Sequence, residues 1–548
     1  MKIVIKNFLV VLAMMVNSAF VVNLSGQNTD KLPRSTPESE GVSSIGIVDF
    51  LNAVDTGRVE LHSFMFIRHG KVIAEGWWNP YGSEYKHIMF SASKTFTATA
   101  IGLAVSENRL KITDKVISFF PYSLPDSISD YMREMTVQNL LTMSVGQDQE
   151  PRRGRDDDWI RSFIATKPAK EPGTVFKYNN TASFMLSAIV QQLTGQTVFD
   201  YLQPRIFKPM AIRGIDWDLN PQGINLGMIG LRLRTEDMAK FGLLLLQNGV
   251  WNGKQLVPKE WVKEATSYKI ESNDGGANRA PKNLNDWDQG YCYQMWRGKN
   301  NSVRLDGMGG QFVVLFPDKD AIVVLTANAN STTQNELDLV HNYLIPAIKS
   351  DKTLPANPGL NNELQKRLSS LSLKPTTAAG LTKSDIESKI SGKEFALPKN
   401  SNNIQSVYFA FNGKECSFAI KRDDNISVIK ADLESWKISN SLSSSLLAPP
   451  QVASKSADAN YKILQQIIKV GASYSWTDKN TLELTARFIE ESLGSETIVC
   501  TFSEVNGAVS VSIAPKAAVG RFGAVPTGRV GPMGPVVTPL RGTLVKID

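Results

Sequence analysis

The chain has 548 residues, which is more than one hydrophobic core usually supports, so we expect two domains. Apolar residues make up 42% of it and charged residues 21%, proportions that are ordinary for a soluble globular protein. Its net charge of +7 is spread without long runs, and no stripe of lysine and arginine with interleaved aromatic residues points to nucleic acid.

The N-terminus has the pattern of a signal peptide, which we place at residues 1–26. Two lysines precede an apolar run from Phe8 to about Val22, and small and polar residues follow it. No cationic stop follows the run, so a retained membrane anchor is only the alternative, and no cysteine follows to carry a lipid. We therefore expect cleavage between Phe20 and Asp30 and a bacterial periplasmic or secreted protein without stable membrane insertion.

Strand patterns at both ends of a first domain, residues 35–350, enclose a largely helical body. Ser63–Trp77 has the pattern of two strands joined by a turn, and strand patterns return at Ser302–Phe316 and Ala321–Ala327. Helical patterns occupy 91–106, Val137–Met143, Thr181–Leu193, Glu236–Gln247 and Gln334–Lys349. This order predicts an α/β domain whose sheet is assembled from its two ends.

Ser91 and Lys94 form a Ser-x-x-Lys motif at the start of the first of these helices. The spacing places the lysine about one helical turn after the serine, on the same face and within reach of its hydroxyl. A serine needs such a neighbouring base to attack a carbonyl group. Two other matches begin at Ser83 and Ser427, but only Ser91 begins an apolar helical segment. The alternative for Ser91 is a helix N-cap beside a solvated lysine.

Tyr178 and Asn180 directly precede the helix expected from Thr181, where a turn can direct both side chains into one cleft. The phenol would lie near the serine, and the amide would donate to the lysine or to a substrate. A model tyrosine has a pKa of about 10, so a phenolate near neutral pH needs a shift of roughly three units, which a nearby Lys94 cation would largely supply. The alternative is a core tyrosine followed by an asparagine that caps the helix.

A glycine-rich segment leads into the later strands and is the candidate third element of the site: Arg304-Leu305-Asp306-Gly307-Met308-Gly309-Gly310-Gln311. Glycines allow a substrate to approach the backbone closely. A backbone N–H just after Gly307, at Met308, would join the N–H of Ser91 in an oxyanion hole, with Gly309 beside it. The alternative is a glycine-rich bulge at the start of a strand.

A change of composition follows the first domain. Residues 351–384 are rich in Pro, Asn, Ser, Thr and Lys, which predicts a linker with a short helical piece around Asn362–Leu371. Residues 385–548 then show alternating strand patterns and predict a separate antiparallel, barrel-like β domain, with an Asn506-Gly507 hairpin turn. The Gly/Pro-rich tail from Val519 to about Arg541 is either an extended edge or a disordered end.

Cysteine and histidine are sparse, and neither forms a ligand pattern. Cys292, Cys416 and Cys500 are too few and too far apart for a disulfide framework. Cys416 and Cys500 lie in strand-like segments, where they either pair or remain small buried apolar residues. The four histidines have no ligand spacing and there is no Cys-x-x-Cys, so we expect neither a metal nor a cofactor.

Together these motifs make residues 35–350 resemble the serine β-lactamase and penicillin-binding-protein superfamily. The resemblance is greatest to its class C-like branch, with esterases, D-aminopeptidases and 6-aminohexanoate-oligomer hydrolases. The segments that carry it are Phe90-Ser-Ala-Ser-Lys94, Leu140-Leu-Thr-Met-Ser-Val-Gly146, Phe176-Lys-Tyr-Asn-Asn180, Gly230-Leu-Arg-Leu-Arg-Thr-Glu-Asp-Met-Ala-Lys240 and Gly307-Met-Gly-Gly-Gln311.

The resemblance implies an α/β (α+β) β-lactamase/transpeptidase-like fold, an antiparallel sheet flanked by helices. It also implies roles for three residues: Ser91 is the acylated nucleophile, Lys94 its activating partner, and Tyr178 the general base that also serves deacylation. The C-terminal β domain resembles extensions on family members and brings no role with it.

The third motif departs from the β-lactamase pattern, because Leu305-Asp306-Gly307 stands in place of Lys-Thr-Gly. The missing lysine would help to hold the carboxylate of a β-lactam or a D-Ala terminus, and an aspartate would repel it. Arg304 points to the opposite face of a strand from Leu305. We therefore expect hydrolysis of an ester or amide in a small-molecule or peptide-like substrate, and rank β-lactamase and D-Ala carboxypeptidase activity below it.

Two rival interpretations remain. The first is a Ser-His-Asp hydrolase with its nucleophile at Ser144 and a histidine at His341, but Thr142-Met-Ser-Val-Gly146 lacks the first glycine and the preceding strand of a nucleophile elbow. The second is a catalytically silent binding or sensor protein that retains the fold. The altered third motif supports the second, and the intact Ser91, Lys94 and Tyr178 count against it.

Overall fold

The computed structural model describes residues 31–544, except for 58, 152, 155–156, 273–284, 330–332, 376–380, 424, 442–444, 448–454, 458–466, 492 and 517–538. The signal peptide expected at 1–26 and most of the Gly/Pro-rich tail lie outside the described residues. Among the residues described, none of the helices combines the length and the apolar character needed to cross a bilayer.

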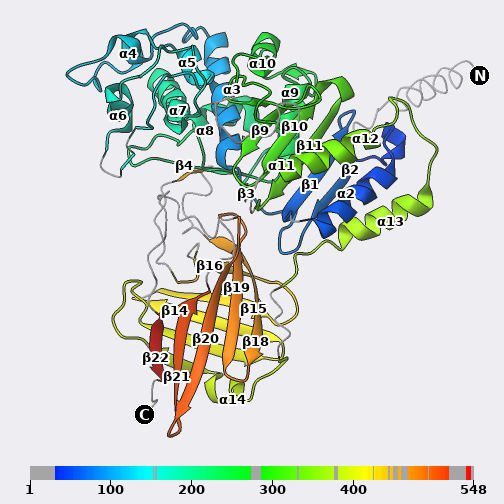
Figure 1. Cartoon of the computed structure of the whole chain (residues 1–548), viewed down its shortest axis with the longest axis vertical. Helices are drawn as coiled ribbons and strands as arrows, with labels where there is room; N and C mark the ends of the chain where they lie inside the picture. The colour runs from blue at the N-terminus through cyan, green and yellow to red at the C-terminus, as the bar shows by residue number, and fades with distance from the viewer. Residues whose placement is uncertain are drawn as a thin grey trace, which may run out of the picture.

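A six-stranded antiparallel sheet, in the order β2-β1-β11-β10-β9-β8, forms the centre of the first domain (Figure 1). Its strands are β1 (Leu61–Arg68), β2 (Lys71–Trp77), β8 (Trp296–Arg297), β9 (Val303–Gly307), β10 (Gln311–Phe316) and β11 (Ala321–Ala327). β1 pairs with β11, with Phe64 opposite Leu325. The two ends of the segment therefore meet within one sheet, which confirms the order expected from the sequence.

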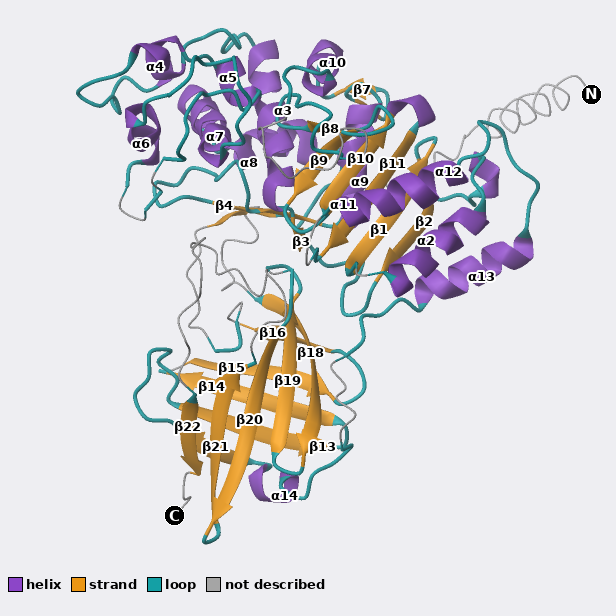
Figure 2. Cartoon of the chain, viewed as in Figure 1, coloured by secondary structure: helices purple, strands orange, loops and turns teal. Residues whose placement is uncertain are grey.

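Helices cover both faces of this sheet (Figure 2). On one face lie α2 (Ser44–Thr56), α11 (Gln334–Leu339), η7 (Val340–Leu344), α12 (Ile345–Ala347) and α13 (Pro358–Ser369). α13 falls inside the segment expected to be a linker, yet Leu364 and Leu368 are buried in the core on this face. Arg367 of α13 also pairs with Asp55 at 2.6 Å. The apolar spacing of α13 therefore attaches this part of the segment to the first domain.

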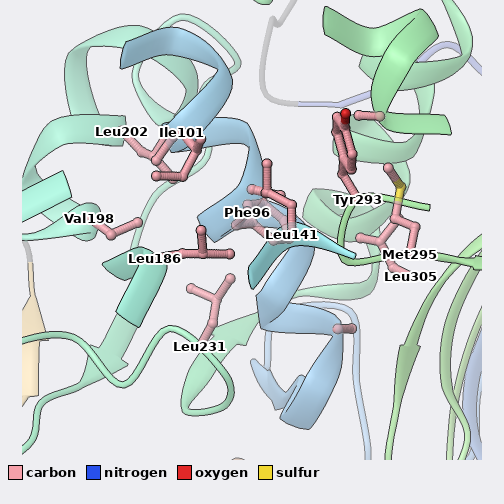
Figure 3. Close-up of a cluster of buried hydrophobic side chains, with 14 of the residues drawn as sticks. Phe96, Ile101, Leu141, Leu186, Val198, Leu202, Leu231, Tyr293, Met295 and Leu305 are labelled. Carbon is pink, nitrogen blue, oxygen red and sulfur yellow. The ribbon is translucent and has the colours of Figure 1, made fainter. Parts of the chain in front are cut away.

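The helical body lies on the other face, around the buried helix α3. Its helices are α3 (Ser93–Ser106), α4 (Asp130–Glu134), α5 (Val137–Leu141), α6 (Trp159–Ala165), α7 (Asn180–Thr194), α8 (Val198–Leu202), α9 (Thr235–Leu246) and α10 (Lys259–Thr266). Figure 3 shows Phe96 and Ile101 of α3 among side chains from α7, α8 and the later chain, including Leu186, Leu202 and Leu231. Apolar packing on all sides holds α3, and with it the candidate nucleophile, in one position.

A small second sheet connects the first domain with the C-terminal part of the chain. It consists of β3 (His87–Ile88), β5 (Leu231–Leu233), β4 (Asp216–Asp218) and β17 (Lys455–Ala457), and the last of these comes from beyond residue 385. A hairpin of β6 (Val250–Trp251) and β7 (Lys254–Gln255) stands apart from both sheets.

The C-terminal domain is a closed barrel whose strand pairs are antiparallel except for the closing pair, β15 with β18, which is parallel, and this confirms the predicted barrel-like β domain. Its strands are β12 (Lys393–Ala396), β13 (Ser406–Asn412), β14 (Glu415–Arg422), β15 (Asn425–Asp432), β16 (Lys437–Ser441), β18 (Ile468–Asp478), β19 (Thr481–Phe488), β20 (Glu496–Val505), β21 (Ala508–Pro515) and β22 (Leu540–Leu544). A pairing between β15 and β18 closes nine of them, and β16 pairs with β18 beside the ring. Its interior is packed with side chains such as Phe409, Phe502 and Trp476, and Cys416 and Cys500 are buried free thiols.

Candidate active site

Ser91 lies in a short 3-10 turn, η2 (Phe90–Ala92), directly before α3 rather than in the helix itself. Phe90 has a φ of 44°, a left-handed conformation that is rare for a bulky residue and is found where surrounding structure enforces it. The turn is held by Ser93, whose hydroxyl donates to the Phe90 carbonyl at 2.6 Å, and by Met89 N, which donates to the Leu231 carbonyl at 2.9 Å. We refer to residues 89–92 as the serine turn.

Lys94 is 1% exposed and makes three hydrogen bonds in the site. Its Nζ donates to Ser91 Oγ at 2.9 Å, to Asn180 Oδ1 at 2.9 Å and to the Met228 carbonyl at 3.0 Å. Burial lowers the pKa of Lys94 to about 7, although the nearby carboxylate of Glu150 opposes this shift. A substantial share of the lysine is therefore neutral near neutral pH.

The partners of Lys94 decide where a neutral amine directs its lone pair. Asn180 Oδ1 and the Met228 carbonyl can only accept hydrogen bonds, so they take the two hydrogens of a neutral amine. The lone pair then faces Ser91, whose hydroxyl is the one partner here that can donate. The geometry is that of a base oriented to take the serine proton.

Asn180 accepts from Lys94, whereas the sequence led us to expect its amide to donate. The reason is Glu150, whose Oε1 accepts from the backbone N of Asn180 at 2.9 Å and from its Nδ2 at 3.0 Å. With Nδ2 bound to a carboxylate, Oδ1 faces the lysine. The helix-cap alternative for Asn180 is also wrong, because the N-cap of α7 is Asn179, which accepts from Ala182 N.

Tyr178 completes the cluster and is hydrogen-bonded to Ser91. Its ring lies 4.9 Å from Lys94 Nζ and stacks against Trp296 at 5.9 Å between ring centroids. Burial raises the pKa of Tyr178 well above its usual value, so the phenol stays protonated. The expectation of a phenolate near neutral pH is therefore not met, because burial, together with the charges of Asp306 and Glu150, outweighs the opposing effect of the hydrogen bond with Ser91 on the tyrosine pKa.

The glycine turn between β9 and β10, residues 307–310, lies against the serine turn. A Cβ on Gly307 would collide with the Met89 carbonyl oxygen and lie 3.3 Å from Ala92 N. Only a glycine allows this approach, which brings Met308 next to the serine turn. Gly309 has a φ of 77°, and a Cβ on it would collide with the side chain of Leu493, a residue of the barrel domain. The alternative of a glycine-rich bulge therefore accounts for the backbone conformation of this turn but not for its close contacts with the serine turn and Leu493.

Asp306 and Arg304 lie on the same face of β9 and form an ion pair of 2.9 Å. Leu305 points the other way and is fully buried in the core. Burial raises the pKa of Asp306, against the effect of Arg304. The position of the absent lysine is thus occupied by a core leucine, and the arginine is committed to the aspartate.

The Ser-His-Asp interpretation has no support in the described residues. The hydroxyl of Ser144 is buried and bonded to Thr142 at 2.7 Å. His341 bonds through its two ring nitrogens to Asn300 and Asp286, each at 3.1 Å. Lys86, the lysine of the Ser-x-x-Lys match that begins at Ser83, forms an ion pair with Asp216 at 2.6 Å.

Sequence reasoning missed Glu150, Met228 and Trp296. Met228 acts through its backbone carbonyl, which no sequence pattern reveals. Trp296 is contributed by the short strand β8, whose two residues give no periodic signal. Glu150 did have a signal, since it is an acidic residue shortly after the Leu140–Gly146 motif, in a loop.

Comparisons with known proteins identify the family of the chain. The Beta-lactamase family model matches residues 52–345, which is more than half of the chain. The 6-aminohexanoate-dimer hydrolase of Paenarthrobacter ureafaciens is 22% identical over 48% of this chain and 71% of its own length, and penicillin-binding protein 4 of Amycolatopsis lactamdurans is 25% identical over 46% and 75%. An octameric penicillin-binding protein homologue from Pyrococcus abyssi, 14% identical, aligns over 86% of this chain and 98% of its own with a TM-score of 0.44. The match of the family model over more than half of the chain shows that the protein belongs to the Beta-lactamase family of serine hydrolases.

Proposed function

We propose that this protein hydrolyses an ester or amide bond through an acyl-enzyme on Ser91. The observation that carries the proposal is the bonding of Lys94, which leaves its lone pair facing the serine hydroxyl. In the first step Lys94 Nζ takes the proton of Ser91 Oγ, and Oγ forms a bond to the substrate carbonyl carbon. The backbone N–H groups of Ser91 and Met308 donate hydrogen bonds to the carbonyl oxygen and stabilise the negative charge that develops on it.

Tyr178 acts as a proton donor in this scheme. Its phenol, held next to Ser91, passes a proton to the leaving alcohol or amine as the bond to the carbonyl carbon breaks. The proton taken by Lys94 then restores the phenol. In the second half of the reaction water attacks the acyl carbon and loses a proton to the neutral Lys94. The bond between the acyl carbon and Ser91 Oγ then breaks, and Lys94 returns that proton to Oγ to regenerate the hydroxyl.

The substrate we propose is a small-molecule or peptide-like ester or amide without a carboxylate near the scissile bond. Asp306 occupies the face of β9 beside the site, and Arg304 is already paired with it. The relative named as a 6-aminohexanoate-dimer hydrolase supports an amide among the substrates. The apolar N-terminal run supports action in the periplasm or outside the cell.

The test is release of nitrophenol from short-chain nitrophenyl esters, and of nitroaniline from the matching anilides, by the wild type and Ser91→Ala, with intact mass measured after rapid quenching. We expect a burst and an acyl adduct on the wild type, and neither on Ser91→Ala. Equal rates in the two proteins would overturn the proposal. Ligand binding without turnover or adduct would favour the binding-protein alternative.

A further inference from the structure

One end of the barrel lies against the catalytic domain. The last residues of β19 and the first part of its connection to β20 lie at this end, and we call the described residues 487–491 and 493–494 the barrel corner. Figure 1 shows the end of the barrel labelled β16 and β19 facing β3 and the main sheet. Among the contacts that the described residues make between the barrel corner and the catalytic domain are two ion pairs, one apolar contact and a hydrogen bond of 3.4 Å from Lys86 N to Glu490 Oε1.

The ion pairs are largely removed from solvent. Arg487 donates to both carboxylate oxygens of Glu60, at 2.8 and 3.0 Å. Glu491 accepts from Arg232 at 2.7 Å, and Arg232 is 1% exposed. Loss of Glu60 removes the carboxylate that pairs with the buried Arg487, whereas loss of Glu491 leaves Arg232 paired with Asp216 and Asp218, at 3.0 and 2.8 Å. Both contacts oppose separation of the two domains.

The apolar contact reaches the glycine turn itself. Leu493 is 4% exposed although it lies in a loop, and its side chain occupies the space that a Cβ on Gly309 would need. Gly309 follows Met308, whose N–H we assign to the oxyanion hole. The residue that Leu493 contacts is therefore the next one in the chain after the proposed oxyanion donor, Met308.

The Glu491–Arg232 ion pair lies one residue from Leu231, which is hydrogen-bonded to the serine turn. Arg232 follows Leu231, whose carbonyl accepts from Met89 N at 2.9 Å and whose N donates to Ser93 Oγ at 3.3 Å. The barrel corner thus touches the neighbours of both backbone segments that frame Ser91. Glu491 acts on the serine side and Leu493 on the glycine side.

We propose that the barrel is a working part of the active site, in which the barrel corner sets the spacing between the serine turn and the glycine turn. Leu493 and Glu491 are positioning residues, since they act through Gly309 and Arg232 on the two oxyanion donors. The proposal rests on the hydrolase function proposed above. It assigns to the barrel a contribution to transition-state binding beyond support of the fold.

The experiment uses the full chain and two variants, Leu493→Ala and Glu491→Gln. Active sites are titrated with a fluorophosphonate, so that kcat is expressed per reactive serine and misfolded protein is excluded. We expect kcat on a nitrophenyl acetate to fall about tenfold with KM little changed, because a displaced oxyanion donor acts on the transition state. Affinity for a phenylboronic acid, which forms a tetrahedral adduct with the serine, should fall by the same factor.

Matched controls separate positioning from stability. Leu482→Ala removes a fully buried leucine from β19 inside the barrel, and Glu483→Gln breaks the pair with Lys516 on the barrel itself. Both should lower thermal stability without changing kcat per titrated site. Leu493→Met, which retains the reach of the side chain, should restore most of the kcat lost in Leu493→Ala.

The outcomes distinguish the two proposals. Turnover at the wild-type rate in Ser91→Ala overturns the proposed acyl-enzyme on Ser91. Turnover that requires Ser91, with wild-type kcat and boronic acid affinity in Leu493→Ala and Glu491→Gln, overturns the role of the barrel corner alone. If Leu493→Ala does not fold, Glu491→Gln decides by the same two readouts.

Discussion

Glu150 holds Asn180 by two hydrogen bonds to a single carboxylate oxygen, one from the backbone N and one from the side-chain amide. This contact fixes the amide so that its oxygen faces Lys94. Because Asn180 Oδ1 can only accept from Lys94, the neutral lysine can accept a hydrogen bond from Ser91 alone among these partners. Glu150, a loop residue outside the recognised motifs, determines this arrangement.

The first prediction follows from this contact. Glu150→Ala should lower kcat at least tenfold, because a freed amide can rotate and present Nδ2 to the lysine. Glu150→Gln retains an acceptor oxygen and should keep most of the activity. Because the charge of Glu150 raises the pKa of Lys94, both changes should move the acid limb of the pH–rate profile to lower pH. Equal kcat in Glu150→Ala and Glu150→Gln would rule out orientation as the role.

The pH dependence of the wild type tests the base directly. Only neutral Lys94 can accept the serine proton, and its folded pKa is lowered to about 7. We therefore expect kcat/KM to rise with pH through an apparent pKa near 7 and to fall about tenfold per unit well below it. The measurement is a profile from pH 5 to 10 with an uncharged ester. An acid limb near 4, or one above 9, would contradict the assignment.

The Tyr178→Phe variant tests whether Tyr178 acts as a proton donor or as the base. Because burial keeps the phenol protonated, its removal should lower kcat by about 100-fold for an anilide and less for a nitrophenyl ester, whose leaving group needs no proton. The acid limb should stay at the wild-type position. Disappearance of that limb in Tyr178→Phe would assign the base to the tyrosine instead. Trp296→Leu, which removes the stacked ring and leaves the phenol, is the matched control and should have a smaller effect.

Gly307→Ala tests the close approach of the two turns. The new methyl group meets the Met89 carbonyl oxygen, so one turn must move, and we expect kcat/KM to fall by about 100-fold or more. Stability should fall by about 1–3 kcal/mol. Gly359→Ala in α13 is the control, since a Cβ there meets only Asn357 Oδ1 at 3.8 Å and the change should leave both quantities nearly unaltered. Chemical unfolding and steady-state kinetics on the same preparations give the comparison.

The parts of the fold that follow from short-range patterns could be predicted from the sequence. The hairpin at His69-Gly70, the strand Ala321–Ala327 and the strand Thr481–Phe488 all have periodic side chains and were located to within a residue or two. Asn506 and Gly507 have φ values of 52° and 78°, as their hairpin turn requires. Ser91, Lys94 and Tyr178 also came together as expected.

What could not be predicted depends on burial and on contacts between distant segments. The sequence places a lysine cation beside Tyr178 and so predicts a lowered tyrosine pKa, whereas burial raises the pKa of Tyr178 and lowers that of Lys94. The direction of the Asn180 bond depends on Glu150, 30 residues away. The contact of Leu493 with Gly309 joins two domains, and neither residue belongs to a pattern that signals the other.

The pairing of β1 with β11 also has a consequence for synthesis of the chain. Leu61 lies opposite Ala327, so the central sheet cannot close until the ribosome has released both. Until then the apolar surfaces of the helical body that face the sheet stay exposed. Pairing of strands this far apart in sequence is slow. The Glu60–Arg487 pair requires a still later residue, because Arg487 follows Glu60 by 427 positions. A chain that completes its reactive centre from segments this far apart exposes apolar surface that a chaperone can bind until the later segments have been synthesised.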